Sequence, residues 1–346
     1  MKPRLKVLGA ETLGVRGLAC LVSVRGREVL VDPGVALGFS RHGLHPHPIQ
    51  AAFAEAVKAA IRRAWGVVSD VVVTHLHGDH LPLRDANPFQ LSLDSLNGVR
   101  GSAPTLWVGA SGLSRREEGR LEELVKVFRR GNLVGGETES PDGLIGLAGP
   151  YNHGLIGGSK VFAVRVGWPG ECVAHLSDTQ LLVEEVIDKV REWGPRVIVT
   201  DGPPTYRLFG GTREAALRRA EGLLRRLAGF ADYVVVDHHV ARSVDGLEWL
   251  DRMRREIGER VMCAADYEGL PRLPLEAWRR ELYEAFPEPN EWFVLRSYAG
   301  DGEAMEEYGD VAFALLKGLP LRRTLTSEEI LPLLRELADR HDRALP

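Results

Sequence analysis

Four side chains of metal-binding type, His75, His77, Asp79 and His80, lie within six consecutive positions of the chain. The β-branched run 71–73 stands before them, and such a run predicts a buried strand. Polar residues that follow a strand lie in the loop at its carboxyl end, where open α/β sheets place their sites. Gly78 is expected to let the backbone turn tightly between the ligands.

The spacing of these residues indicates a site for two metal ions. His75 and His77 alternate, so both imidazoles can reach one ion, whereas Asp79 and His80 lie beyond the turn and can reach a second. Imidazole and carboxylate ligands without thiolates suit Zn²⁺, and also Mn²⁺ or Fe. Two such ions lower the pKa of a trapped water to about 7, and the resulting hydroxide attacks a carbonyl or phosphoryl centre. Asp79 would orient this nucleophile or carry its proton.

The sequence Thr-His-Leu-His-Gly-Asp-His at 74–80 resembles the H-x-H-x-D-H motif of the metallo-β-lactamase superfamily. The resemblance implies an α/β (α+β) fold, a four-layer αββα sandwich with a dinuclear metal site at one edge of its two packed sheets. His153, after a Gly-rich stretch, resembles the third motif and would complete the first ion's ligands. Asp178 stands in a Leu-Ser-Asp-Thr turn that resembles the family's Gly-Asp-Thr turn, with Ser177 in place of glycine, and it would bridge the two ions.

Two further strand ends carry polar residues. The run 234–236 leads into Asp237, His238 and His239 with the same spacing as the first motif. This parallel favours His238 as the last ligand of the second ion. His239 is the alternative ligand, and Asp237 or the other histidine would support the ligands. Asp32, which stands between a strand and Pro-Gly, either makes a turn or matches the superfamily aspartate that supports the ligands through hydrogen bonds.

Hydrophobic patterning predicts the elements that position these residues. Strands are expected at 5–8, 18–24, 28–31, 71–73, 105–108, 161–166, 197–200 and 234–236, with one more strand leading into Asp178. Helices are expected at 49–65, 114–130 and 211–229, and the Gly-rich segment 135–149 is expected to be a loop. Each candidate ligand therefore follows a predicted strand or lies in the loop beside one.

Two loops are expected near the site. Segment 39–48 holds His42, His45 and His47, and it is either an inert exposed loop, a loop that faces the substrate through His42, or another metal site. Tyr206 follows a Gly-Pro-Pro turn, and its hydroxyl would donate to a substrate oxygen or simply pack. Composition does not distinguish between these roles.

Composition narrows the class of protein. The 346 residues are 44% hydrophobic and 27% charged, which is typical of a globular protein. A net charge of −4 gives no overall attraction for nucleic acid. Cys20, Cys172 and Cys263 are far apart, which disfavours a disulfide framework or a cysteine zinc site and indicates buried thiols. With no signal peptide or membrane-spanning run in view, a cytoplasmic protein without a membrane partner is expected.

Pro287 and Pro289 mark a predicted boundary between two parts of the chain. Residues 1–286 would form the metallo-β-lactamase-like domain, and through stretches such as Gly-Pro-Pro-Thr-Tyr and Asp-His-His they resemble an uncharacterised archaeal group of predicted hydrolases in the superfamily. Residues 287–346 would be an extension packed on the sandwich. Within it, 292–295 is expected to be a strand, and Thr-Ser-Glu-Glu at 326–329 predicts a helix start with a capping box.

These features predict a metal-dependent hydrolase that acts on an ester, lactone or phosphodiester of a small molecule. Arg41, Arg84 and Arg207 lie near the predicted site loops and slightly favour an anionic or phosphorylated substrate. A metal-dependent nuclease would use the same chemistry, but the net charge disfavours it. So does the interval from Asp178 to His238, which is short for the insertion of nucleic-acid-processing β-CASP members. The same ligands would also suit a diiron oxidoreductase or a non-catalytic metal-binding protein.

Overall fold

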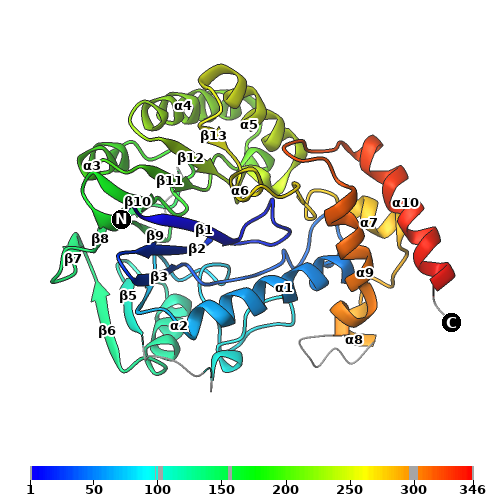
Figure 1. Ribbon diagram of the computed structural model, residues 1–346, viewed down its shortest axis with the longest axis horizontal. Coiled ribbons are helices and arrows are strands. Elements are labelled where there is room, and N and C mark those ends of the chain that lie inside the picture. The colour runs from blue at the N-terminus through cyan, green and yellow to red at the C-terminus, as the bar shows by residue number, and fades with distance from the viewer. Residues whose placement is uncertain (1, 98, 100–103, 155–157, 296–302, 345–346) are drawn as a thin grey trace.

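Two β-sheets form the centre of the computed structural model, and helices cover their outer faces (Figure 1). The structure describes residues 2–97, 99, 104–154, 158–295 and 303–344. The first sheet contains β1 (Arg4–Gly9), β2 (Ala19–Val24), β3 (Arg27–Val31), β4 (Asp70–Val73), β5 (Thr105–Gly109) and β6 (Arg130–Val134). The second contains β7 (Thr138–Glu139), β8 (Ile145–Asn152), β9 (Lys160–Trp168), β10 (Glu171–His175), β11 (Val197–Thr200), β12 (Tyr233–Val236) and β13 (Val261–Met262). The helices are α1 (Pro48–Trp65), α2 (Arg115–Val125), α3 (Glu185–Trp193), α4 (Gly210–Ala228), α5 (Val244–Ile257), α6 (Ala264–Glu268), α7 (Arg279–Ala285), α8 (Trp292–Leu295), α9 (Glu303–Gly318) and α10 (Ser327–Ala344).

Strand direction brings the candidate ligands to one edge of the two sheets. In the first sheet, ordered β1 to β6, strands β3 to β6 run parallel. In the second, ordered β13 to β7, strands β10 to β13 run parallel, and β8 shares their direction because it is antiparallel to β9, which is antiparallel to β10. The carboxyl ends of β4, β8, β10 and β12 therefore meet, as sites in α/β sheets require.

Alternation along the strands builds the layers. In β4, Val71 and Val73 face the hydrophobic cluster beneath α1, whereas Val72 lies in the cluster between the sheets. In β12, Val235 faces the first sheet, and its two neighbours Val234 and Val236 face the cluster under α3, α4 and α5. Three clusters thus alternate with two sheets, and the predicted four-layer αββα sandwich is confirmed.

Most predicted strands and helices are present, but three assignments were wrong. The helix expected over 114–130 ends at Val125, because Arg130–Val134 pairs with β5 as the edge strand β6. The segment 135–149, expected to be a loop, contains β7 and the start of β8. Residues 292–295 form helix α8 rather than a strand, and the buried Trp292 indole donates to the carbonyl of Pro46 at 2.8 Å.

Two expectations from composition can be compared with the structure. Cys20, Cys172 and Cys263 are buried free thiols, as predicted. Among the helices that the structure describes, none combines the length and the apolar character that crossing a bilayer requires.

The C-terminal helices extend the helical layer over the first sheet. Figure 1 shows α9 lying along α1, and side chains of α9 and α10 belong to the same hydrophobic cluster as those of α1. The capping box is confirmed, since the Thr326 amide donates to Glu329 at 2.9 Å and the Glu329 amide donates back to the Thr326 hydroxyl at 3.4 Å. The boundary at 287 stays a prediction, and residues 296–302 and 345–346 of the extension lie outside the described part.

A buried charge cluster fixes the segment before α7 against the sandwich. The carboxylate of Glu276 is 4% exposed and forms two hydrogen bonds with the Arg16 guanidinium. Arg41 and Arg279 approach the same carboxylate at 3.8 and 3.7 Å. Burial would raise the pKa of Glu276, but these arginines, Arg16 above all, outweigh burial and lower it. The ionised carboxylate is therefore required by the fold.

We predict that Glu276→Gln lowers the free energy of unfolding by about 3–5 kcal/mol, because the substitution leaves the buried Arg279 and the partly exposed Arg16 without their counter-charge. Urea denaturation at neutral pH measures this. The exposed pair of Arg335 and Glu284 supplies the control, and Glu284→Gln should cost about 0–1 kcal/mol. Because the folded pKa is lowered, the difference from wild type is full above the ordinary value of 4.5 and shrinks as the pH falls toward the folded value. Equal costs at the two positions would contradict the prediction.

Candidate metal centre

The loop after β4 brings the first motif to the edge of the sandwich. His75 and His80 are buried, and His77 and Asp79 are partly exposed. Gly78 lies in the tight turn that was expected, closed by the His80 amide donating to the His77 carbonyl at 2.9 Å, and its φ is not positive. What matters is space, because a Cβ at Gly78 would lie 2.8 Å from both the Gln90 amide nitrogen and a methyl of Leu83.

Four predicted ligands form the first group of converging side chains. They are His75, His77, His153 and Asp178, whose ligand atoms lie within 4.8 Å of one another. Asp178 Oδ2 lies 3.6 Å from His75 Nε2 and 3.0 Å from His153 Nε2. Nε2 of His77 is hydrogen-bonded to the Ser159 hydroxyl at 3.0 Å. The structure thus brings together residues from β4, β8 and β10.

A second group lies on the other side of Asp178. It contains Asp79, His80 and His238, again within 4.8 Å of one another. His80 Nε2 lies 3.3 Å from Asp178 Oδ1, and His238 Nε2 lies 3.6 Å from Asp79 Oδ2. Oδ1 of Asp178 therefore faces His80, whereas Oδ2 lies near His75 and His153 and also 3.7 Å from His238 of the second group.

Unsatisfied atoms test whether the centre fits a metal ion. His75 Nε2, His80 Nε2 and Asp178 Oδ1 are buried, and none of the three has a hydrogen-bond partner. Buried polar atoms normally have partners because leaving one unpaired costs about 1–3 kcal/mol. Lone pairs of imidazole and carboxylate that converge on one another suit a divalent cation. The set of ligand atoms therefore fits a divalent metal ion.

Asp32 supports the ligands from behind. Its Oδ1 accepts the Thr74 amide at 2.7 Å, and its Oδ2 accepts the Thr74 hydroxyl at 2.7 Å and pairs with His80 Nδ1 at 2.9 Å. Gly34 permits this approach, because a Cβ there would overlap the backbone nitrogens of His80 and Leu81. A carboxylate on Nδ1 fixes the tautomer in which Nε2 is free to bind a metal. Of the two interpretations of Asp32, the geometry favours support of the ligands.

The serine that replaces the family's glycine also contacts the centre. Ser177 has a φ of 50°, and its hydroxyl lies 2.6 Å from that of Thr74 and 3.2 Å from His75 Nδ1. Its hydrogen bond to Nδ1 helps to set the orientation of the His75 ring.

Charge interactions are strong throughout the centre. Burial lowers the pKa of His75 well below its usual range, and the neighbouring His80 and His77 lower it further. For His80 burial acts in the same direction, but Asp178 and Asp32 outweigh burial and raise the pKa well above the usual value. Burial would raise the pKa of Asp178, yet His80 and other histidines hold it well below its usual range. The surroundings thus favour negative charge on Asp178 and positive charge beside it, as a cation-binding position requires.

His238 and His239 differ in their partners. His238 accepts the Gly17 amide at Nδ1 at 3.2 Å, and it belongs to the group of Asp79 and His80. His239 Nδ1 pairs with Asp201 Oδ2 at 2.6 Å, and its Nε2 lies 3.9 Å from Asp178. Both histidines belong to a group of converging ligand atoms with Asp178. Nε2 of His238 also accepts from Arg242 at 2.9 Å, whereas the carboxylate on His239 leaves its Nε2 available, so the geometry keeps both histidines as candidates.

Asp237 turns away from these groups. It accepts the amides of Thr12 at 3.1 Å and Ala264 at 3.0 Å, so it joins the loop after β1 to the start of α6. Among the described residues, the groups of converging ligand atoms do not include it. Its contacts are those of a residue that organises the backbone before His238.

The remaining candidates lie at the rim. The Tyr206 hydroxyl accepts from Arg242 Nη1 at 3.0 Å, and its ring packs against guanidinium groups. His42 is exposed on the loop after β3. The three histidines of that loop do not form a metal site, since His45 packs between Phe39 and Phe293 and His47 caps α1.

Sequence reasoning missed a buried cation beside the ligands. Arg242 donates from Nη2 to Asp79 Oδ2 at 3.1 Å and from Nε to Glu11 Oε1 at 2.7 Å, and both Arg242 and Glu11 are buried. The one local sign was its place four residues after His238. Glu11 gave no sign, because it comes from the loop after β1.

The αββα sandwich and the histidine-rich centre at its edge define a protein of the metallo-β-lactamase class. Residues 14–81 match the family model described as the metallo-beta-lactamase superfamily, whose members are generally metal-dependent hydrolases. Among solved structures, this chain is similar to Igni18, a novel metallo hydrolase from the hyperthermophilic archaeon Ignicoccus hospitalis. The TM-score is 0.41 with 16% identity, over 76% of this chain and 96% of that chain.

Archaeal relatives specify the family. A UPF0282 protein of Methanosarcina mazei is 34% identical over 310 residues, which cover 88% of this chain and 99% of that protein. A second UPF0282 protein, from Aeropyrum pernix, is 33% identical over 305 residues, which cover 81% of this chain and 98% of that protein. The chain belongs to the UPF0282 family. The predicted membership of an archaeal group in the superfamily is confirmed.

We predict that His238→Ala lowers the bound metal per chain and that His239→Ala leaves it near the wild-type level, because His238 is grouped with Asp79 and His80. Elemental analysis after gel filtration measures the content, and melting curves control for folding. Loss of metal in His239→Ala alone would assign the ligand to His239 instead.

Proposed function

We propose that this protein is a hydrolase that uses two divalent metal ions to cleave a small anionic substrate, with a phosphate ester favoured over a lactone. The observation that carries the proposal is the convergence of unpartnered buried atoms around Asp178. His75 Nε2 lies in one ligand group, His80 Nε2 lies in the other, and Asp178 offers an oxygen to each. Histidine and carboxylate ligands favour Zn²⁺, with Mn²⁺ or Fe as alternatives.

Asp79 is suited to orient the attacking water. Divalent ions in such a centre activate a water molecule and polarise the bond to be cleaved. Burial would raise the pKa of Asp79, but His80, His238 and Arg242 outweigh burial and hold it well below the usual range. Its carboxylate therefore stays ionised, which suits a ligand that accepts a hydrogen bond from the water better than a group that takes up its proton. Arg242 at 3.1 Å keeps it in place.

A cavity beside the first ligand group supports a small substrate with one anionic end. Its volume is about 550 Å³, and both His77 and His153 line it. Its other lining residues include Leu182, Pro204, Leu208 and the polar residues Gln180, Thr212 and Arg207. Of the three arginines singled out in the sequence, Arg207 alone is among the described residues that line this cavity. Its guanidinium would pair with a substrate phosphate or carboxylate.

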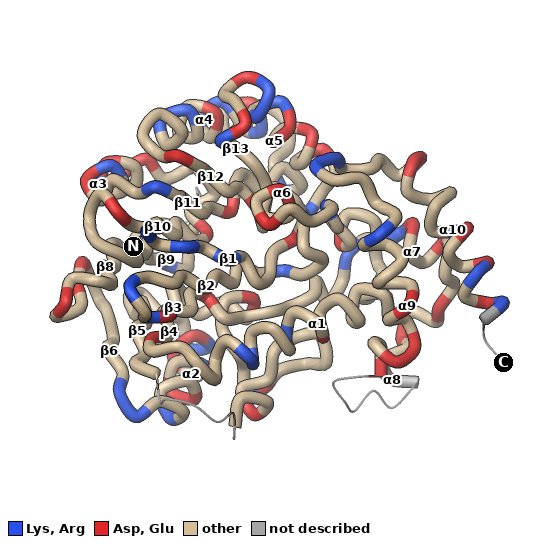
Figure 2. The backbone as a smooth tube through the Cα atoms, viewed as in Figure 1, with Lys and Arg blue, Asp and Glu red and all other residues tan. Residues whose placement is uncertain are grey.

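The charge distribution supports a small substrate over a polymer. Figure 2 shows acidic and basic positions interspersed along α3, α4, α5 and α10. Many of the arginines on these helices are paired with carboxylates, as Arg225 is with Glu256 and Arg226 is with Glu184. A polyanion would need a continuous basic surface to gain from counterion release.

The first test measures metal content and hydrolysis together. The purified protein is expected to hold about two ions of zinc or manganese per chain and to cleave a chromogenic phosphomonoester or phosphodiester. His77→Ala should lose metal and activity, and His42→Ala, which changes an exposed histidine, should lose neither. No bound metal in wild type, or equal activity in wild type and His77→Ala, would refute the proposal. About two irons with a visible absorption band would favour a redox enzyme.

We predict that Arg207→Gln raises KM for an anionic substrate about tenfold and changes kcat little, because one charge-assisted hydrogen bond to a remote group is lost. Steady-state kinetics on a charged ester and on a neutral ester of the same leaving group measure this. Arg218→Gln, on the exposed face of α4, is the matched control. An unchanged KM for the anionic ester would show that Arg207 does not meet the substrate.

A further inference from the structure

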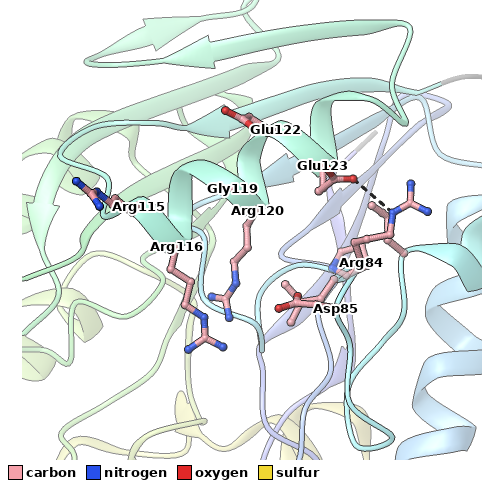
Figure 3. A pocket seen from close by; sticks show the side chains of 11 residues that line it. Arg84, Asp85, Arg115, Arg116, Gly119, Arg120, Glu122 and Glu123 are labelled. Carbon is pink, nitrogen blue, oxygen red and sulfur yellow. Dashed lines mark ion pairs between the residues drawn. The ribbon is translucent and has the colours of Figure 1, made fainter.

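A second pocket lies on the other side of the loop that carries the first motif. Its volume is about 370 Å³, and it opens between α2 and the segment 82–85 (Figure 3). The described residues that line it share none with the cavity beside His77 and His153. Four of them are arginines, namely Arg84, Arg115, Arg116 and Arg120.

Two of these arginines face the same space, and neither is held in an ion pair with another described residue. Figure 3 shows the side chains of Arg116 and Arg120 pointing the same way from α2, whereas Arg115 points away. In the part of the chain that the structure describes, neither Arg116 nor Arg120 forms an ion pair. Arg84 is different, since it pairs with Asp94 at 2.5 Å and with Glu123 at 3.4 Å.

Arg120 is built into the wall of the pocket. Its Nη1 donates to the carbonyl of Leu76 at 2.7 Å, so the side chain is fixed against the loop between His75 and His77. Its Nε is buried and has no hydrogen-bond partner. Burial lowers the pKa of Arg120, and the charge of Arg116 lowers it further, which indicates that the two guanidiniums repel each other. Arg120 is thus a fixed cation that has an unused N–H donor and lies beside the second cation, Arg116. A bound anion would reduce the repulsion between the two guanidiniums.

We propose that this pocket binds a small phosphate-bearing anion between Arg116 and Arg120. Guanidinium groups bind phosphate through paired N–H donors, and two of them match its charge. Of the acidic neighbours, Glu123 is held by Lys126 at 2.6 Å and Glu122 points away from the arginines in Figure 3. Asp85 also lines the pocket beside Arg120, but one carboxylate does not balance the two guanidiniums, and among the described residues it forms no ion pair with either.

An anion bound in this pocket would act on the metal centre through Arg120. Arg120 holds the Leu76 carbonyl, and Leu76 lies between the predicted ligands His75 and His77. Binding itself does not depend on the proposed hydrolase function, and its test can fail or succeed independently.

The test is isothermal titration of the full-length protein, with its native metal content, with inorganic phosphate. Wild type should bind phosphate. Arg116→Gln should raise the Kd by about tenfold, which corresponds to the loss of one charge-assisted hydrogen bond. Arg115→Gln removes an arginine one position away whose side chain points elsewhere, and it should stay within about twofold of wild type. Phosphate that binds at the metal centre contributes equally in all three proteins.

Two results would overturn the proposal. One is equal phosphate affinity in Arg116→Gln, Arg115→Gln and wild type, which would place the binding elsewhere. The other is no binding by wild type at millimolar phosphate. Arg116 is exposed, so its variant should melt as wild type does, and a melting curve checks this. A parallel titration with glycerol phosphate distinguishes free phosphate from a phosphate ester. The pocket prefers whichever of the two binds with the lower Kd.

Discussion

The structure depends on one buried carboxylate, that of Asp178. Burying a negative charge is costly unless positive charge or hydrogen bonds surround it. Here the surroundings are imidazoles, with His75, His80, His153 and His238 each within 4 Å of an oxygen of Asp178. Neutral imidazoles do not cancel a full charge, so the position calls for a proton on His80 or for a metal cation. The edge of the sandwich is organised around that requirement.

Thr74 connects the surroundings of Asp178 to the rest of the fold through hydrogen bonds. Its amide and hydroxyl bind Asp32, its hydroxyl meets Ser177, and its carbonyl accepts the Phe162 amide at 3.1 Å. One residue at the end of β4 therefore ties its own loop to the loops after β3 and β10 and to strand β9. Small shifts at any of these strand ends would move the ligands, which explains why so many of the polar groups here are buried and paired.

Local patterns were enough to predict part of this centre. His75, His77, Asp79 and His80 were predicted because a strand followed by ligands is a local signal, and the resemblance to a superfamily added His153 and Asp178. Arg242 and Glu11 were missed, since the bond between them joins residues 231 positions apart. The choice between His238 and His239 stayed open for the same reason, because it depends on hydrogen bonds to distant Gly17 and Asp201. Helix α8 was mistaken for a strand because Trp292 is buried by tertiary contacts rather than by strand pairing.

The ligand groups draw on both sheets, and this has a consequence for the lifetime of the protein. His75 to His80 come from the first sheet, and His153, Asp178 and His238 come from the second. A cation held among them would cross-link the two sheets of the sandwich. A ligand that binds only the folded state stabilises it by about 2.7 kcal/mol at a hundred times its Kd. Metal supply in the cell would then govern how long each molecule escapes unfolding and proteolysis, as well as whether it is active.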